Sequence, residues 1–235
     1  MSGHSKWSTI KHKKEITDNK RGQAFTKLVR AITVACRDGG ADLESNFKLR
    51  LAVEKARQVN MPKVNIDRAI EKGSGVGDHG FMEAVYEGFG PGGTAIIVEV
   101  LTDNKNRSVS EIKKVFEKGG GTLGQPGSVA FLFDKKGLML IAKKEKADEQ
   151  MLELIDLGAD DVEEREEAVE VVTAPNRLAE IKGKIEAKGG SILEADLVYI
   201  PKSRVKLEEQ VMEKVENFME SLDDMDDVQA IYSNL

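Results

Sequence analysis

Apolar residues recur every three or four positions in three segments of the first third of the chain. This period is typical of amphipathic helices, so we predict three of them. The predicted helices run from Thr17 or Asp18 to Gly39, over about 46–59, and over about 62–72. Ser45 or Asn46 is suited to cap the second helix, because its side chain can accept a backbone N–H. The spacing therefore predicts a small three-helix domain.

The pattern changes after a glycine-rich linker at 73–80. Residues 94–101 and 128–133 are β-rich runs that flank a helical stretch at 106–118. Ser108 and Glu111 have the spacing of a capping box for this helix. Farther on, residues 137–202 predict the order β-α-β-β-α-β, which is the ferredoxin-like pattern.

The last segment predicts a helix at 207–222 and a strand at 227–233. An isolated helix and strand cannot bury their apolar faces, so we expect them to complete the domain begun at 94–133, with Val205 in a short third strand. The predicted fold is α+β with three domains: an N-terminal three-helix domain and two ferredoxin-like domains, one inserted in the other. The predicted bounds are 1–17 for a basic arm, 18–77 for the helical domain, 78–135 with 203–235 for the discontinuous domain, and 136–202 for the insertion.

Charge is distributed unevenly along this chain of net charge −6. Residues 1–77 contain 16 Lys or Arg against 8 Asp or Glu, and the remainder contains 19 against 33. A basic third on an acidic body indicates a polyanionic partner for that third. The single Cys36 cannot form an internal disulfide, and neither an apolar signal segment nor a membrane span is evident, so we expect a cytoplasmic protein.

The sequence gives little support to metal, cofactor or catalytic chemistry. His4, His12, His79 and Cys36 lack the spacing of a zinc site, and the acidic run 223–227 lacks the ligand pattern of an EF-hand, so we interpret that run as a solvated turn. The glycine-rich segments 87–94 and 119–128 precede strands, unlike a phosphate-binding loop, and are interpreted as turns. Asp103, Asn104 and Arg107 are interpreted as helix-capping residues. We predict that the protein is not an enzyme and has no cofactor.

The basic N-terminal region is the candidate binding site. Lysine and arginine release counterions when they contact phosphates, and an exposed Trp or His can stack on a base. Residues 1–17 show neither helical nor strand periodicity and are predicted to form an extended arm. The candidate nucleic-acid-binding residues are Lys6, Trp7, Lys11, His12, Lys13, Lys14, Lys20, Arg21, Lys27 and Arg30.

Several long motifs resemble one known family. They are GHSKWSTIKHKK, DNKRGQAFTKL, NMPKVNIDRAIEKGSG, YEGFGPGGTAIIVEVLTDNKNRSVSEIKKVF and DDVQAIYSNL, and they extend over essentially the whole chain. They resemble the YebC/PmpR family, which implies three domains, one of them inserted in another. The family's label implies a probable DNA-binding transcriptional regulator. Related members that act on ribosomes, including at proline-rich stalls, and a mitochondrial translational activator imply an alternative.

Two partners therefore stay open: DNA, or ribosomal and transfer RNA. The second and third predicted helices could form a helix-turn-helix, but only Lys63 and Asn65 are well placed to read bases, so a plain bundle is favoured. A basic arm with Trp7 and His12 suits folded RNA with unstacked bases, which favours a ribosome-associated translation factor. Neither reading specifies an oligomeric state.

Overall fold

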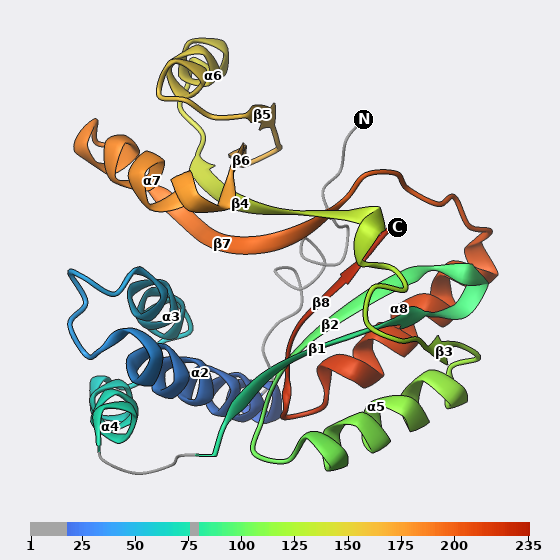
Figure 1. Cartoon of the computed structure of the whole chain (residues 1–235). Coiled ribbons are helices and arrows are strands. Elements are labelled where there is room, and N and C mark those ends of the chain that lie inside the picture. The colour runs from blue at the N-terminus through green and yellow to red at the C-terminus, as the bar shows by residue number, and fades with distance from the viewer. Residues whose placement is uncertain (1–17, 76–79) are drawn as a thin grey trace. The chain divides into compact units, whose positions relative to one another are not determined.

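The computed structural model describes residues 18–75 and 80–235. Of these described residues, those up to Asp134 form one compact unit together with Pro201–Leu235, and Lys135–Ile200 form a second. The second unit is therefore inserted into the sequence of the first. The fold is α+β, with a helical N-terminal region and two antiparallel sheets (Figure 1). Among the described residues, no helix is long and apolar enough to cross a membrane.

The helical region consists of α2 (Asp18–Gly39), α3 (Phe47–Gln58) and α4 (Lys63–Ser74). Asn46 caps α3, because its side chain accepts a hydrogen bond from the Leu49 amide at 3.0 Å. This bond satisfies one of the free N–H groups at a helix start. The apolar stripes of the three helices meet in a buried cluster that includes Ile32, Leu49 and Ile66. Cys36 is buried in the same cluster, in agreement with its place on an apolar helix face.

α4 approaches α2 most closely at a glycine. A Cβ atom on Gly73 would lie 2.5 Å from the Thr33 carbonyl oxygen and 2.7 Å from the Cys36 Cβ atom. Two side chains of α2 also donate to carbonyls of α4: the Thr33 hydroxyl to Ala69 at 3.3 Å and the Cys36 thiol to Ile70 at 3.3 Å. Gly73 is therefore a packing residue, since any side chain there would separate the two helices.

The first unit also contains a sheet of order β3-β1-β2-β8. Its strands are β1 (Met82–Phe89), β2 (Ala95–Thr102), β3 (Thr122–Leu123) and β8 (Val228–Ser233). All three neighbouring pairs are antiparallel, and a 3₁₀ turn at Pro91–Gly93 joins β1 to β2. Helices α5 (Lys105–Lys118) and α8 (Glu209–Asp223) lie on one face of this sheet (Figure 1).

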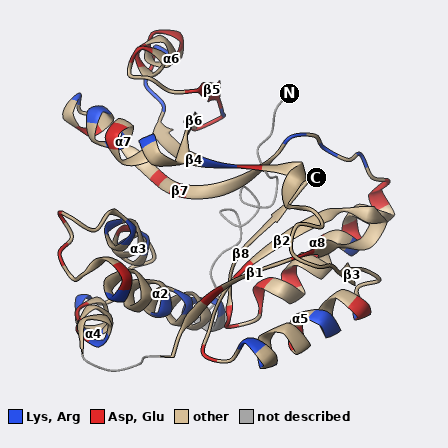
Figure 2. Cartoon of the chain, viewed as in Figure 1, with Lys and Arg blue, Asp and Glu red and all other residues tan. Residues whose placement is uncertain are grey.

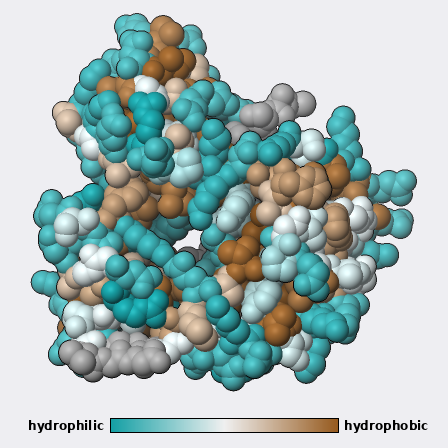
Figure 3. Space-filling model, in the orientation of Figure 1, coloured by the Kyte–Doolittle hydropathy of each residue, from teal (hydrophilic) through white to brown (hydrophobic). Residues whose placement is uncertain are grey.

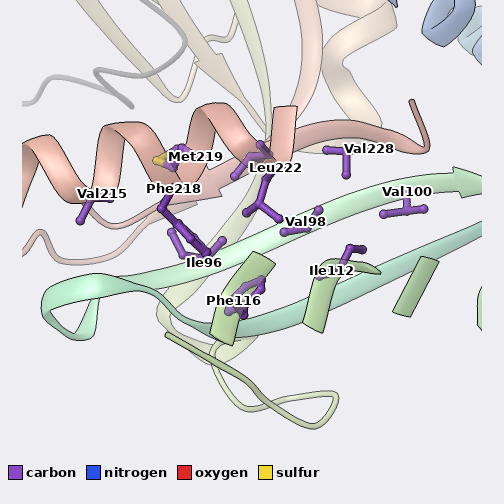
Figure 4. Packing of buried hydrophobic residues seen from close by; sticks show 11 residues of the cluster. Ile96, Val98, Val100, Ile112, Phe116, Val215, Phe218, Met219, Leu222 and Val228 are labelled. Atoms are coloured by element: carbon purple, nitrogen blue, oxygen red, sulfur yellow. The ribbon is translucent and has the colours of Figure 1, made fainter. Parts of the chain in front are cut away.

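The core of this part lies between the sheet and its two helices (Figure 4). Ile96, Val98 and Val100 alternate along β2 and belong to the buried cluster, as the period of a strand requires. Phe116 of α5 meets Phe218 of α8 edge to face, with ring centroids 5.0 Å apart and planes at 84°. This geometry is favoured for aromatic pairs and fixes the two helices against each other.

The second unit has the ferredoxin-like arrangement that the sequence predicts. Its elements follow the order β4 (Phe133–Ala142), α6 (Ala147–Asp156), β5 (Asp161–Glu164), β6 (Ala168–Thr173), α7 (Leu178–Ala187) and β7 (Ile192–Pro201). The spatial order is β5-β6-β4-β7, so the first and third strands of the unit are the central ones. Every residue of β6 is buried, which agrees with its nearly continuous run of apolar residues.

The strand predictions for the first sheet are partly wrong. β1 was not predicted, because Glu83, Glu87 and Gly88 interrupt its apolar alternation. Residues 128–133 were predicted as a strand, but Ala130–Leu132 is a 3₁₀ turn and the next strand begins at Phe133. The strand beside β2 is therefore β1, and residues 128–133 are not a strand of this sheet.

Two local predictions in the first unit are also wrong. Val205 lies outside the strands, and its N–H donates to the carbonyl of Asn234, the residue after β8, at 2.8 Å. The N-cap of α5 is Asn104, whose side chain accepts from the Arg107 amide at 3.0 Å. Ser108 is consequently inside the helix, where it is buried, rather than at its start as a capping box requires.

Candidate nucleic-acid interface

Six of the ten predicted binding residues lie outside the part of the chain that the structure describes. They are Lys6, Trp7, Lys11, His12, Lys13 and Lys14. The other four, Lys20, Arg21, Lys27 and Arg30, lie on α2. Of these four only Arg21 is classed as exposed, and the other three are partly buried.

The three partly buried cations of α2 form ion pairs with the acidic end of α8 and the turn after it. Lys20 pairs with Glu220 at 2.9 Å, Lys27 with Asp223 at 2.9 Å, and Arg30 with Asp227 at 2.5 Å. Positions 20, 27 and 30 share one side of a helix, so a single face of α2 makes all three contacts. We name these three cations the α2 stripe. Its charges have carboxylate partners within the chain, a role that the sequence analysis did not assign to them.

The helix end of α8 explains why cations gather there. The last turn of α8 contains only Glu, Ser, Leu and Asp, and the free carbonyls at a helix end carry partial negative charge. α2 supplies the missing donors: the Lys27 ammonium donates to the Asp223 carbonyl at 2.5 Å and the Gln23 amide to the Asp224 carbonyl at 3.4 Å. Figure 2 shows the acidic residues at this end of α8 and the basic residues along α2. Gln23 of α2 thus serves as a donor to this helix end.

Asp227 is the centre of a hydrogen-bond network. Its carboxylate accepts from the Ser108 hydroxyl at 2.6 Å, the Thr102 hydroxyl at 2.9 Å, Arg107 at 3.0 Å and Arg30 at 2.5 Å. Burial raises the pKa of Asp227, but these donors outweigh burial and lower the pKa to about 2. The network therefore joins α2, the end of β2, the start of α5 and the turn before β8 through one charged side chain.

The interpretation of residues 223–227 as a solvated turn is wrong for two of its carboxylates. Asp227 is 5% exposed, and Asp223 is partly buried against Lys27. The interpretation of Asp103 and Arg107 as capping residues needs an addition, because Arg107 joins Asp103 at 2.7 Å to the buried Asp227. Neighbours in sequence could not reveal these pairs, since their partners lie far apart along the chain.

Further exposed cations of the helical region lie outside the ten predicted binding residues, although Lys63 was expected to be well placed to read bases. Arg57 and Lys63 flank a recess of about 170 Å³ between the end of α3 and the start of α4, lined by Leu43, Val53, Met61, Ile66, Asp67 and Ile70. Arg68 is exposed one turn farther along α4. The start of α4 therefore presents Lys63 to solvent, whereas Asn65 is only partly exposed. In the sequence, the exposure of Arg57, Lys63 and Arg68 was indicated only by their positions in a short turn and on polar helix faces.

The two glycine-rich turns meet at one end of the first sheet. Gly88 and Phe89 of β1 pair with Leu123 and Thr122 of β3. The buried carboxylate of Glu87 accepts from the amides of Gly127, Val129 and Ala130 at 2.8, 2.9 and 2.8 Å. Burial raises the pKa of Glu87, but the three backbone donors outweigh it and leave the pKa below its ordinary value. The segment that contains Pro126 is thus anchored by a charged acceptor.

Exposed apolar side chains are scattered over the described chain. The most exposed of the large apolar side chains are Val64, Phe131 and Leu152, at 57%, 65% and 64%. On the face that Figure 3 shows, hydrophobic areas are separated by hydrophilic side chains. Scattered exposure is ordinary for a protein surface, so charge is the more informative feature here. Within residues 18–75 and 80–235, no group of three or more His, Cys, Asp or Glu is placed to hold a metal ion.

Two family models together match nearly the whole chain. The model for the TACO1/YebC protein N-terminal domain matches residues 5–76, and the model for the TACO1/YebC second and third domain matches residues 81–235. The chain belongs to the TACO1/YebC family. The boundary between the two models falls in the glycine-rich linker, next to the start of β1.

Relatives of this TACO1/YebC protein share its full length. A probable transcriptional regulatory protein of Desulforapulum autotrophicum is 49% identical, over 100% of this chain and 96% of its own. A probable transcriptional regulatory protein of Thermotoga maritima is 46% identical, over 100% of this chain and 93% of its own. The crystal structure of a conserved hypothetical protein from Aquifex aeolicus has a TM-score of 0.88 and 43% identity, over 98% of this chain and 96% of its own.

Proposed function

We propose that this TACO1/YebC protein is a nucleic-acid-binding regulator of gene expression that acts without catalysis. Its basic N-terminal third binds phosphates, and its acidic remainder limits non-specific association. Transcriptional regulation through DNA is the first form of the proposal, in line with the names of the bacterial relatives. The site of action is the cytoplasm.

The observation that carries the proposal is the charge asymmetry between the parts of the chain. Residues 1–30 contain eight Lys or Arg and two acidic residues in a protein of net charge −6. The α2 stripe is paired internally, so the arm supplies the first contacts: Lys6, Lys11, Lys13 and Lys14 for phosphates, Trp7 and His12 for bases. Arg21, Arg57, Lys63 and Arg68 add exposed positive charge on the helical region.

A second candidate function is a ribosome-associated translation factor that contacts ribosomal or transfer RNA. The specific observation in its favour is the start of α4, where a DNA-reading helix would present donors to base edges. Lys63 is the only well-exposed donor side chain among residues 63–65, since Asn65 is partly buried. Val64, which is 57% exposed, is apolar. Weak base readout combined with a basic arm suits backbone and stacking contacts on folded RNA.

The test compares two partners and uses one variant of the arm together with a matched control variant. Binding of the wild-type protein to promoter-length duplex DNA and to purified ribosomes is measured over a range of salt concentrations. The same measurements are made with Lys11, Lys13 and Lys14 changed to Glu, and with a control in which Lys113, Lys114 and Lys118 of α5 are changed to Glu. The control makes the same change in net charge at exposed positions far along the sequence.

The outcomes separate the candidates. Sequence-selective DNA binding at physiological salt, without ribosome association, supports transcriptional regulation and rejects the translation candidate. Ribosome binding that the arm variant loses and the α5 control keeps supports the translation candidate. Equal loss in both variants, or no binding to either partner, contradicts the proposed role of the arm.

A further inference from the structure

We propose that the acidic end of α8 is a built-in competitor for the nucleic acid. In the described structure its carboxylates, together with Asp227 of the following turn, occupy the α2 stripe, and binding of a phosphate backbone displaces the outer carboxylates, Glu220 and Asp223, from these cations. This inference rests on the proposed function, because it concerns how the same basic region is regulated. It assigns to the acidic residues a role beyond holding the fold together.

The geometry of the three pairs supports competition because each is a direct charge contact. The distances are 2.9 Å for Lys20 to Glu220, 2.9 Å for Lys27 to Asp223 and 2.5 Å for Arg30 to Asp227. A carboxylate and a phosphate make the same kind of charge-assisted hydrogen bond to Lys and Arg. One cation can therefore change from the first partner to the second without a new kind of interaction.

Burial of the carboxylate partners increases along the stripe, from Glu220 to Asp227. The side chains of Lys20 and Glu220 are 43% and 37% exposed, those of Lys27 and Asp223 are 13% and 26%, and those of Arg30 and Asp227 are 16% and 6%. Exposed ion pairs contribute little to stability, so the outer pair opens readily. The inner pair is anchored, because Asp227 also accepts from Thr102 and Ser108. We therefore expect release to begin at Lys20 and to stop before Arg30.

The stripe follows the arm directly in the sequence, so competition at the stripe affects how far a bound polyanion can extend beyond the arm. Lys20 lies three residues after the arm ends, so a phosphate backbone held by Lys11, Lys13 and Lys14 can extend along the chain toward it. The first contacts are made by the arm, and the stripe becomes available only at the cost of its carboxylate partners. The acidic end of α8 thereby lowers the affinity for short or weakly bound polyanions.

The test removes the outer carboxylates while keeping Asp227. The double variant Glu220→Gln/Asp223→Asn is compared with Glu111→Gln/Glu213→Gln, which removes two exposed carboxylates of α5 and α8 and makes the same change in net charge. The probes are a labelled single-stranded RNA and a duplex DNA of equal length. We expect the first variant to bind about three- to tenfold more tightly than the second, because two partly exposed ion pairs no longer compete.

A third variant locates the gain. Lys20→Gln/Lys27→Gln added to the first double variant should return the affinity to that of the control. Melting temperatures of all variants are measured to verify that each is folded.

Each outcome bears on the inference. Tighter binding by Glu220→Gln/Asp223→Asn that depends on Lys20 and Lys27 supports it, even where the wild type binds weakly. Equal affinity of the two double variants, with clear binding by the wild type, overturns the competition and leaves the proposed function standing. Absence of binding by the wild type and by every variant overturns both.

Discussion

Arg30 of α2 and Asp227, in the turn before β8, form a largely buried ion pair of 2.5 Å. The two residues are 197 positions apart, and the pair joins the helical region to the sheet of the same unit. Arg30 also donates to the Asp226 carbonyl at 2.7 Å and stacks over the Phe81 ring at 5.3 Å from its centroid. A residue that looks like one more phosphate contact in the sequence is thus part of the structural framework.

The Asp227 network predicts a dependence of stability on acid. The pKa of Asp227 is about 2 in the folded protein, below the ordinary value, so the charged form stabilises the fold above about pH 4 and this contribution is lost as the pH falls toward 2. The charged form of Asp227 contributes about 2 kcal/mol to the free energy of unfolding. Denaturant unfolding at several pH values should show the free-energy difference between wild type and Asp227→Asn shrinking by about this amount from pH 5 to pH 2.

Two further variants sharpen this test. Ser108→Ala removes a donor at 2.6 Å, so the pH-dependent part should become smaller. Asp226→Asn changes an exposed side chain next to the network and should follow the wild type. Parallel pH curves for wild type and Asp227→Asn would show that the carboxylate is not stabilised by its donors.

The anchor made by Glu87 predicts local loosening when its charge is removed. Glu87→Gln weakens the bonds from Gly127, Val129 and Ala130 and brings an N–H group toward their amides. We expect a loss of about 1–3 kcal/mol in unfolding free energy and faster hydrogen exchange at 127–130. Glu83→Gln, at an exposed position of the same strand, is the control. Unchanged exchange at 127–130 in Glu87→Gln would contradict the anchor.

The close approach of α4 to α2 predicts opposite results for two glycines. Gly73→Ala places a Cβ atom 2.5 Å from the Thr33 carbonyl oxygen, so it should destabilise the helical region by about 1–3 kcal/mol. Gly183→Ala in α7 meets no atom within 4 Å and should raise stability by about 0.5–1 kcal/mol through helix propensity. Thermal unfolding measures both changes. A neutral Gly73→Ala would show that the helices can separate without loss.

The division between arm and helix predicts that binding and stability can be separated. Trp7→Ala should weaken nucleic-acid binding by about tenfold and leave the melting temperature nearly unchanged, because a stacked base is lost. Phe25→Ala should lower the melting temperature, since Phe25 packs against the buried cluster of the helical region. A large fall in melting temperature for Trp7→Ala would place that side chain in a core instead.

The sequence predicted those features that depend on local periodicity. The three N-terminal helices, the cap at Asn46 and the ferredoxin-like order of the second unit all follow from spacing, caps and turns. β1 was missed because Glu83, Glu87 and Gly88 interrupt its apolar alternation, and the strand is instead held by its backbone pairing with β2. The exact domain bounds, and the role of the arm, stay predictions.

The ion pairs of the candidate site could not be predicted from the sequence. Lys20, Lys27 and Arg30 were grouped with the arm by charge alone, whereas their carboxylate partners lie about 200 residues away. Long-range ion pairs leave no local signal, since a charged residue has the same appearance whether it faces solvent or another helix. The same reason hid the burial of Asp227 within an acidic run that was interpreted as solvated.

If the basic arm binds phosphates, the affinity for nucleic acid must depend on salt through the arm's lysines. The measurement is the slope of log K against log salt concentration for wild type and for Lys11→Gln/Lys13→Gln/Lys14→Gln on one nucleic acid. Each lost phosphate contact reduces the slope by about 0.7 on single strands or about 0.9 on duplex DNA, so the slope of the triple variant should be flatter by about 2–3. Equal slopes and equal affinities for the two proteins would contradict it.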